Sequence, residues 1–199
     1  MRLLEVVAIA TMCALATGVH AQSTQRIRGD VVSVEGPKLE VRTRTGELAS
    51  ITLADQYKVS AVVKATADAI VPGAYVGTAS MPQPDGSGRA LEVLVFPESG
   101  RGSGEGHYAW DLKPGSMMTN ATVAQVANID NGRRITLKYK DGEKTIDVPP
   151  DAPIVTFEPG SREMLRPGAH VMLNARIQAD GSLSATGVAV GKDGLVPPM

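Results

Sequence analysis

Side chains that bind soft metals gather in one short stretch of the sequence. His107, Trp110, Met117 and Met118 lie close together there, and the chain has no second tryptophan. Thioether and imidazole groups are ligands for Cu(I) and Ag(I), because soft ions prefer sulfur. One hypothesis is therefore a periplasmic Cu(I)/Ag(I) site made by His107, Met117 and Met118, with the Trp110 ring beside the ion. The alternative is that Trp110 and Tyr108 pack this stretch between two lobes and that one methionine enters a core face.

The sequence contains no recognisable set of catalytic or cofactor-binding residues. There is no His-Xaa-Glu, no Ser-Xaa-Xaa-Lys and no run of spaced acids like that of an EF-hand. The single cysteine, Cys13, excludes an internal disulfide framework and a multi-cysteine metal site. The glycine-rich run 100–106 lacks the strand and the Lys-Ser/Thr pair of a phosphate-binding loop, so we expect a flexible connector. We therefore predict no enzyme activity, no catalytic residues and no cofactor.

The charge balance argues against nucleic acid as a partner. Lys plus Arg is 20 and Asp plus Glu is 21, which gives a formal net charge of −1, and aromatic residues make up 4% of the chain. A nucleic-acid surface needs a basic groove and stacking aromatic rings. We expect the partner to be a component of the cell envelope or a small ligand, with acidic glycans and lipid head groups left open.

Residues 1–21 have the pattern of a secretory signal peptide. Arg2 precedes an uncharged, mostly apolar run over residues 6–16, and Val19 and Ala21 supply the small residues that signal peptidase requires. The run is too short to span a membrane, which takes about 20 residues. We predict cleavage after Ala21 and a periplasmic or secreted protein. Cys13 would leave with the signal, and a mature chain without cysteine suits an oxidising compartment.

The chain repeats itself at a spacing of 95 residues. Val-Pro-Gly-Ala-Tyr-Val at 71–76 matches Arg-Pro-Gly-Ala-His-Val at 166–171, and Asp-Gly-Ser at 85–87 matches Asp-Gly-Ser at 180–182. A constant spacing across several motifs indicates two homologous lobes. We place these lobes at 25–98 and 119–193, with a Trp-containing linker at 99–118 and a C-terminal tail at 194–199.

Each lobe has the pattern of five short strands. In the first lobe these are 27–34, 39–45, 48–53, 74–81 and 90–96, and in the second 122–129, 133–140, 144–148, 169–177 and 183–190. Between the third and fourth strands, 57–70 is compatible with a short helix and 151–165 with one helical turn. Three strands, a helix or loop and two strands is the order of the OB-fold barrel. The predicted fold is all-β, with two tandem five-stranded OB-like barrels after the signal peptide.

These motifs resemble a group of uncharacterised bacterial exported domains. Gly-Asp-Val-Val-Ser-Val at 29–34, the Pro-Gly-Ala turns and the Asp-Gly-Ser turns carry the resemblance over nearly the whole mature chain. The resemblance implies small OB-like barrels and assigns no activity, since the motifs are turn glycines and core valines. The function predicted from the sequence is non-enzymatic binding or scaffolding in the cell envelope with an unknown ligand. Soft-metal binding is the alternative.

Overall fold

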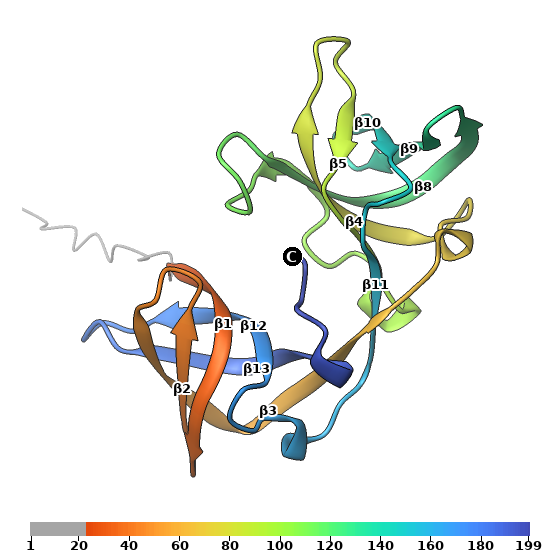
Figure 1. Ribbon diagram of the computed structural model, residues 1–199. Helices are drawn as coiled ribbons and strands as arrows, with labels where there is room; N and C mark the ends of the chain where they lie inside the picture. Colours follow the sequence, from red (N-terminus) through yellow and green to blue (C-terminus); the bar gives the residue numbers. More distant parts are fainter. Residues whose placement is uncertain (1–22) are drawn as a thin grey trace, which may run out of the picture.

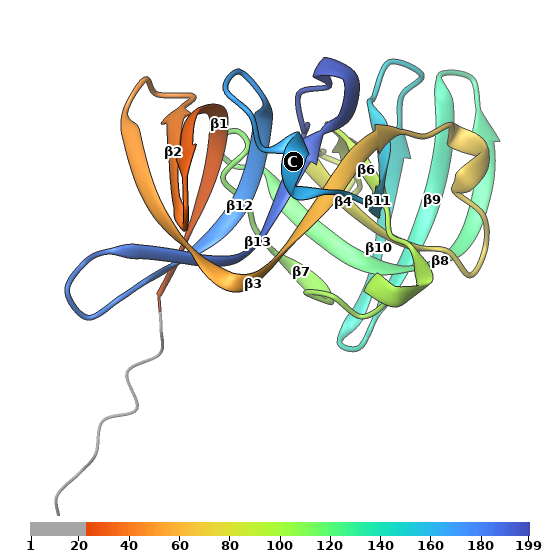
Figure 2. The ribbon, with the colours of Figure 1, turned by 90° about the horizontal axis from the view of Figure 1, so that it is seen from below.

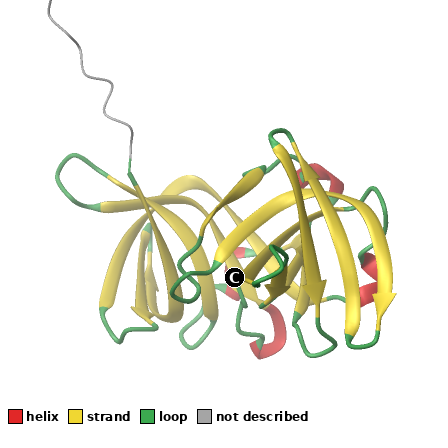
Figure 3. Ribbon diagram, turned by 90° about the horizontal axis from the view of Figure 1, so that it is seen from above, coloured by secondary structure: helices red, strands yellow, loops and turns green. Residues whose placement is uncertain are grey.

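The computed structural model describes residues 23–199, and this part of the chain is almost entirely β-structure (Figure 3). The predicted signal peptide and Cys13 lie outside the described residues. Within them, no helix has the length and apolar character needed to cross a membrane.

Thirteen strands belong to one continuous sheet. In the first half of the chain they are β1 (Thr24–Glu35), β2 (Lys38–Thr43), β3 (Leu48–Lys64), β4 (Tyr75–Pro82), β5 (Gly88–Ala90), β6 (Val93–Val95) and β7 (Gly106–Ala109). In the second half they are β8 (Met117–Ile129), β9 (Gly132–Tyr139), β10 (Gly142–Val148), β11 (Ile154–Pro159), β12 (His170–Ile177) and β13 (Leu183–Gly191). Within residues 23–199, three single 3₁₀ turns lie between strands, namely η1 (Ala67–Ala69), η2 (Glu98–Gly100) and η3 (Arg162–Met164), and a fourth, η4 (Lys192–Gly194), follows β13.

Five strands close into a barrel, which we call the first barrel. Their order is β1-β2-β3-β13-β12, and β12 returns to β1. The pairing of β13 with β3 is parallel and the others are antiparallel. Figure 1 shows the red and orange strands from the start of the chain alongside the blue strands from its end. This barrel therefore draws on both halves of the sequence.

β4, β5, β8, β9 and β10 form a second strand group, which also draws on both halves of the sequence. β8, β9 and β10 from the second half pair with β4 and β5 from the first half. The pairing of β5 with β10 is again parallel, and β4 returns to β8. The prediction that 25–98 and 119–193 each form their own barrel is therefore corrected, because each half gives its last strands to the other half.

The two Pro-Gly-Ala segments make equivalent contacts in this exchange. Val123 N donates to Ala74 O at 2.8 Å, and Gly73 N donates to Val123 O at 2.8 Å. In the same way, Val31 N donates to Ala169 O at 2.9 Å. Each motif thus pairs with the first strand of the other half. Because the two motifs are alike, their sequences do not reveal whether each motif pairs with the first strand of its own half or of the other half.

The two halves cross where β3 and β11 pair antiparallel. Val155 lies opposite Lys64, Phe157 opposite Val62, and Pro159 opposite Ser60. At the repeat spacing of 95 residues, Val62 corresponds to Phe157 itself, so this pair marks a local pseudo-twofold centre. Figure 2 shows β3 as the long strand that runs from the first barrel towards the second strand group.

Two connecting segments differ from the expectation. In residues 57–70 the strand β3 continues to Lys64, and the helix is limited to the single 3₁₀ turn η1. In 151–165 the expected helical turn is present as η3, but β11 precedes it. Both extra strand segments belong to the crossing of the two halves, which a prediction based on separate lobes does not contain.

The core has three parts. One cluster around Ile27, Leu39 and Ile51 fills the first barrel, and a second around Val76, Ile135 and Leu137 fills the second strand group. A third cluster lies at the crossing and includes Val62, Leu94, Val155, Ala189 and Met199, with Phe96, Phe157 and Met172 packed against it. The candidate site lies against this third cluster.

Candidate functional site

A cavity of about 310 Å³ lies where the two halves meet. Its walls come from β1, β4, β6, β8, β11 and β12, from segment 103–110, and from the end of the chain. Four aromatic residues and three methionines line it: Phe96, Tyr108, Trp110, Phe157, Met118, Met172 and Met199. Arg26, Glu92, Asn120 and Asn174 add polar groups. A mostly apolar cavity with a few polar groups is the usual form of a small-ligand site.

Glu92 is the most unusual of these residues because its side chain is fully buried. It is 0% exposed and lies between β5 and β6, where the ladder with β4 contains an extra residue. Its Oε1 accepts a hydrogen bond from Ala79 N at 3.0 Å. Oε2 has no hydrogen-bond partner in the described structure. An unpaired buried carboxyl oxygen is costly, so it requires an explanation.

Burial dominates the electrostatics of Glu92. Desolvation raises its pKa to about 8, against smaller opposing effects from the Ala79 hydrogen bond and the charge of Arg28. The carboxyl group is therefore mostly protonated at neutral pH. In that form it can donate a hydrogen bond as well as accept one.

The position 95 residues after Glu92 has no acid. At the spacing of 95 residues, Gly187 corresponds to Glu92, and Ala185 and Val188 correspond to Ala90 and Val93. The ladder of β13 is also irregular between Ala185 and Gly187. The irregularity in β13 thus contains a glycine where the irregularity beside β4 contains Glu92.

Trp110 brings a second unpaired polar atom to the same cavity. Its Nε1 is buried and has no hydrogen-bond partner in the part of the chain that is described. The guanidinium carbon of Arg26 lies 3.8 Å from the centre of the indole ring, and Tyr108 meets the ring edge-on at 6.1 Å. The ring is thus fixed by a cation–π contact and an aromatic contact, and its buried N–H has no acceptor in the described structure.

Asp111 holds the two arginines next to Trp110. It accepts hydrogen bonds from Arg26 Nε at 3.0 Å and from Arg28 Nη2 at 2.8 Å. Partial burial raises the pKa of Asp111, but the hydrogen bond and charge of Arg28 and the charge of Arg26 outweigh this effect and lower it to about 2. Arg28 Nε also donates to the main-chain oxygen of Met199 at 2.5 Å. Arg28 is thereby fully engaged, whereas Asp111 occupies only Nε of Arg26.

The expected flexible linker is an ordered wall of this cavity. β7 pairs antiparallel with β8. The carbonyl oxygen of Ser103 accepts hydrogen bonds from Tyr75 Oη and Asn120 Nδ2, both at 3.2 Å. Tyr108 Oη donates to Gly104 O at 3.2 Å and accepts from Asn120 Nδ2. The glycine-rich run is therefore held by specific contacts from β4 and β8.

The end of the chain covers the opposite side of the cavity. Arg44 Nη2 donates to Pro197 O at 2.9 Å, and Met199 is 3% exposed. Figure 1 shows the C-terminus between the first barrel and the second strand group. The segment predicted as a tail is thus part of the site.

The structure divides the predicted metal ligands between the two faces of the β7–β8 pair. His107 lies opposite Thr119, Tyr108 opposite Met118, and Ala109 opposite Met117. Since side chains alternate along a strand, His107 and Met117 lie on one face and Met118 on the other. Met118 and Trp110 line the cavity, and the other two do not. The four-residue set expected from the sequence does not converge on one point.

His107 has partners of its own. Its Nδ1 lies 2.9 Å from Thr119 Oγ1, and its ring stacks on Tyr139 with centroids 6.4 Å apart. Burial and the nearby charge of Lys144 lower the pKa of His107. Among residues 23–199, no group of three or more His, Cys, Asp or Glu side chains is placed to hold a metal ion.

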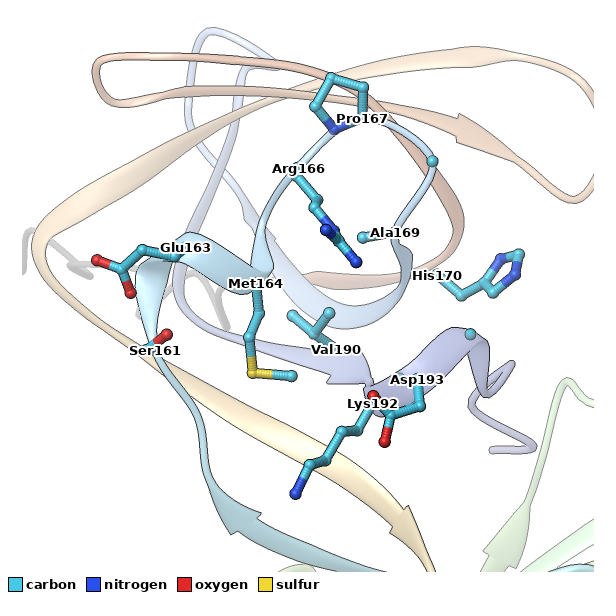
Figure 4. Close-up of a pocket in the computed structure, with 13 residues that line it drawn as sticks. Ser161, Glu163, Met164, Arg166, Pro167, Ala169, His170, Val190, Lys192 and Asp193 are labelled. Atoms are coloured by element: carbon cyan, nitrogen blue, oxygen red, sulfur yellow. The ribbon is translucent and has the colours of Figure 1, made fainter.

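A more open depression beside η3 and β12 is a weaker candidate. It has a volume of about 530 Å³ and includes His170, whose Nδ1 lies 2.5 Å from Asp30 Oδ1. Figure 4 shows that Glu163 and His170 point to opposite sides of it and that Arg166 lies between them. Its polar groups do not converge, so it does not define a site.

Comparison with known proteins adds no family to this picture. No protein-family model, no curated protein and no solved structure matches the chain. The site therefore has to be interpreted from its own chemistry.

Of the residues that the sequence singles out as metal ligands, Trp110 and Met118 line this cavity, and Glu92 is not among those residues. The signal was present, since Glu92 is the one charged residue in the otherwise apolar run 91–96. Its counterpart in the repeat is an uncharged Gly187. The pattern that points to this site is a charged residue in an apolar strand, where the residue 95 positions later is uncharged.

Proposed function

We propose that this chain is an exported, non-enzymatic binding protein of the bacterial cell envelope that takes a small ligand into the cavity at the crossing. One observation carries the proposal: Glu92 Oε2 and Trp110 Nε1 are both buried without partners, and both residues line the same cavity. Within residues 23–199, two unpaired buried polar atoms on residues of one cavity are a cost that a bound ligand would remove. The signal-peptide pattern supports export.

The same proposal includes the architecture. The first barrel joins its strands in the order first, second, third, fifth and fourth, if β12 and β13 are counted as the fourth and fifth. The second strand group has the same order with β4 and β5 in those places. We propose that both are OB-like barrels, related by exchange of their last two strands. The cavity then lies between two barrels, which is a common location for a ligand site.

A panel of small molecules, screened by thermal unfolding, tests this function. Asn174→Phe places a large side chain at the edge of the cavity. Arg176→Phe is the matched control, because Arg176 is also exposed on β12 but does not line the cavity. We expect some compounds to raise the unfolding temperature of the wild type and Arg176→Phe but not of Asn174→Phe. A panel in which every stabilising compound acts equally on all three proteins would overturn the proposal.

The three methionines support a second candidate function. Met118, Met172 and Met199 line the cavity together with Trp110, so thioethers suitable for Cu(I) or Ag(I) are present there in a set different from the one expected. Titration with Ag(I) tests this candidate, with Trp110 fluorescence as the signal. Saturable quenching that is lost in Met172→Leu would support it, and an unchanged signal in the wild type would exclude it.

A further inference from the structure

We propose, on the basis of the proposed function, that the ligand is a small carboxylate with an apolar body, held by the Trp110 indole N–H, the Arg26 guanidinium and the Glu92 carboxyl group. The free polar groups of the cavity and their charge determine which ligand group it can hold.

Trp110 and Arg26 supply donors to the cavity, whereas the free acceptor of fixed polarity is the Oδ1 atom of Asn120. Trp110 Nε1 can only donate, and it has no acceptor in the described structure. Arg26 lines the cavity and uses Nε for Asp111, and its two Nη atoms make no hydrogen bond within residues 23–199. Asn120 Nδ2 is already bonded to Ser103 O and Tyr108 Oη. The ligand group that suits indole and guanidinium donors is an acceptor.

Glu92 completes this arrangement as an acid. Because burial raises its pKa to about 8, it carries a proton at neutral pH and can donate through Oε2 while Oε1 keeps its bond to Ala79 N. A protonated carboxyl group beside a ligand carboxylate forms a charge-assisted hydrogen bond, which is stronger than a neutral one. An ionised Glu92 would repel the same ligand.

The other charged and titratable groups around the cavity are consistent with an anion. β1 contributes Arg26 and Arg28, and segment 106–116 contributes Tyr108 and Asp111. Burial raises the pKa of Tyr108, so this phenol stays neutral well above pH 7. Asp111 is shared between two arginines, and Arg28 is also bonded to the main-chain oxygen of Met199. Arg26 is therefore the guanidinium that remains for a ligand.

The remaining walls select the body of the ligand. Phe96, Phe157, Met118 and Met172 present apolar surface around a volume of about 310 Å³. Burial of an aromatic or branched aliphatic group there contributes affinity in proportion to its apolar area. A free inorganic anion or a long polymer does not fit this combination of size and surface.

Three probes that share one ring and differ in their polar group test the inference: benzoate, benzamide and benzylamine. Binding is followed by calorimetry and by the fluorescence of Trp110, the chain's single tryptophan. At pH 7 we expect benzoate to bind at least about tenfold more tightly than the neutral amide, since charge-assisted bonds are about twice as strong as neutral ones. Benzylamine should bind weakest.

The pH dependence has a definite sign. Benzoate affinity should stay constant up to about pH 7 and then fall as Glu92 loses its proton, by about tenfold between pH 7 and pH 9. Glu92→Gln keeps a donor in place at every pH, so its benzoate affinity should not change over this range. If the ligand were a cation, its affinity would instead rise with pH in the wild type and be lost in Glu92→Gln.

A second variant tests the guanidinium. At the position equivalent to Arg26, the other half of the chain has Met118, because Val31 and Val123 make the same hydrogen bonds and Arg26 and Met118 each precede them by five residues. Arg26→Met therefore copies a side chain that this cavity already holds. It should weaken benzoate about tenfold or more and benzamide by less than about threefold. Arg42→Met, at an exposed arginine of β2, should change neither.

The outcomes separate the two proposals. Preference for benzamide or benzylamine, or benzoate binding that does not change between pH 7 and pH 9 in the wild type, would overturn the carboxylate and leave the cavity as a binding site. If the cavity-dependent stabilisation described above is found with other compounds and none of the three probes binds, the carboxylate is again overturned. If no compound shows that dependence and no probe binds, both proposals fail.

Discussion

Val62 and Phe157 lie opposite each other at the midpoint of the β3–β11 pair, and from this point each half of the chain continues into the other. β12 and β13 complete the first barrel around β1, and β4 and β5 complete the second strand group with β8. Neither half therefore contains all the strands of the first barrel or of the second strand group. The cavity at the crossing exists only when both halves are present.

Cleavage between the halves should therefore leave the protein assembled. A protease site inserted between Gly102 and Ser103 lies in an exposed turn, and cutting it divides the chain between β6 and β7. We expect the two pieces to co-elute on gel filtration with unchanged far-UV circular dichroism, because the strand ladders between halves remain. They should separate only in denaturant.

Two tandem barrels would behave differently. Each piece would then fold alone, and the cut protein would run as two smaller species. Expression of residues 23–102 alone provides the control, and we expect this piece to be unfolded or aggregated because β1 and β3 would lack β12 and β13. A soluble, folded monomer of this piece would contradict the exchanged arrangement.

Local patterns in the sequence predict most of the strands but not β7, β11 or the second part of β3, and they do not predict the partners. Alternation and turn glycines correctly predict β1, β2, β4, β9 and β12, and the Asp-Gly-Ser turns are present as expected: Asp85 Oδ1 accepts from Ser87 N at 3.0 Å, and Asp180 Oδ1 from Ser182 N at 2.9 Å. Partner choice is different, because β4 and β12 carry the same motif and fit either first strand. β3 continues beyond Leu53 without glycine or proline, and this extension carries the chain from the first barrel to the other strands.

Glu92 should give the protein's stability a distinctive pH dependence. Its pKa is about 8 when folded, against a reference value of 4.5. Between these values the native state retains a proton that the unfolded chain releases, so this group lowers the stability as pH rises through the window. The slope for one group is at most about 1.4 kcal/mol per pH unit.

Urea unfolding of the wild type and Glu92→Gln checks this dependence. The variant should gain stability relative to the wild type from pH 5 to pH 8, and the gain should stop growing above pH 8. Glu143→Gln, at an exposed glutamate of β10, is the control and should show a constant difference. A constant difference for Glu92→Gln as well would show that its carboxyl group is not protonated in the native protein.

Met117 and Met118 are neighbours in sequence but should respond differently to truncation. Met118 is 4% exposed and lines the cavity, whereas Met117 lies on the other face of β8 and is only partly buried. Met118→Ala should cost about 2–4 kcal/mol of unfolding free energy and shift the emission of Trp110, because it leaves a void beside the ring. Met117→Ala should cost less than about 1 kcal/mol and leave the emission unchanged. Equal effects on both measurements would place the two side chains in the same environment and contradict the strand register.

Gly191 and Gly187 form a matched pair that tests how the end of the chain is held over the cavity. A Cβ at Gly191 would lie 1.6 Å from Leu195 O, so Gly191→Ala forces segment 195–199 to move. A Cβ at Gly187 would have Lys58 O at 3.5 Å as its nearest neighbour, which is ordinary contact. We expect Gly191→Ala to cost about 1–3 kcal/mol and to make Met199 accessible to carboxypeptidase, while Gly187→Ala stays within about 0.5 kcal/mol of the wild type. Gly191→Ala should also weaken the binding of any ligand in the cavity, because Met199 is part of the cavity wall. If carboxypeptidase removed Met199 from the wild type as fast as from Gly191→Ala, segment 195–199 would not be docked. The cavity would then be open on this side.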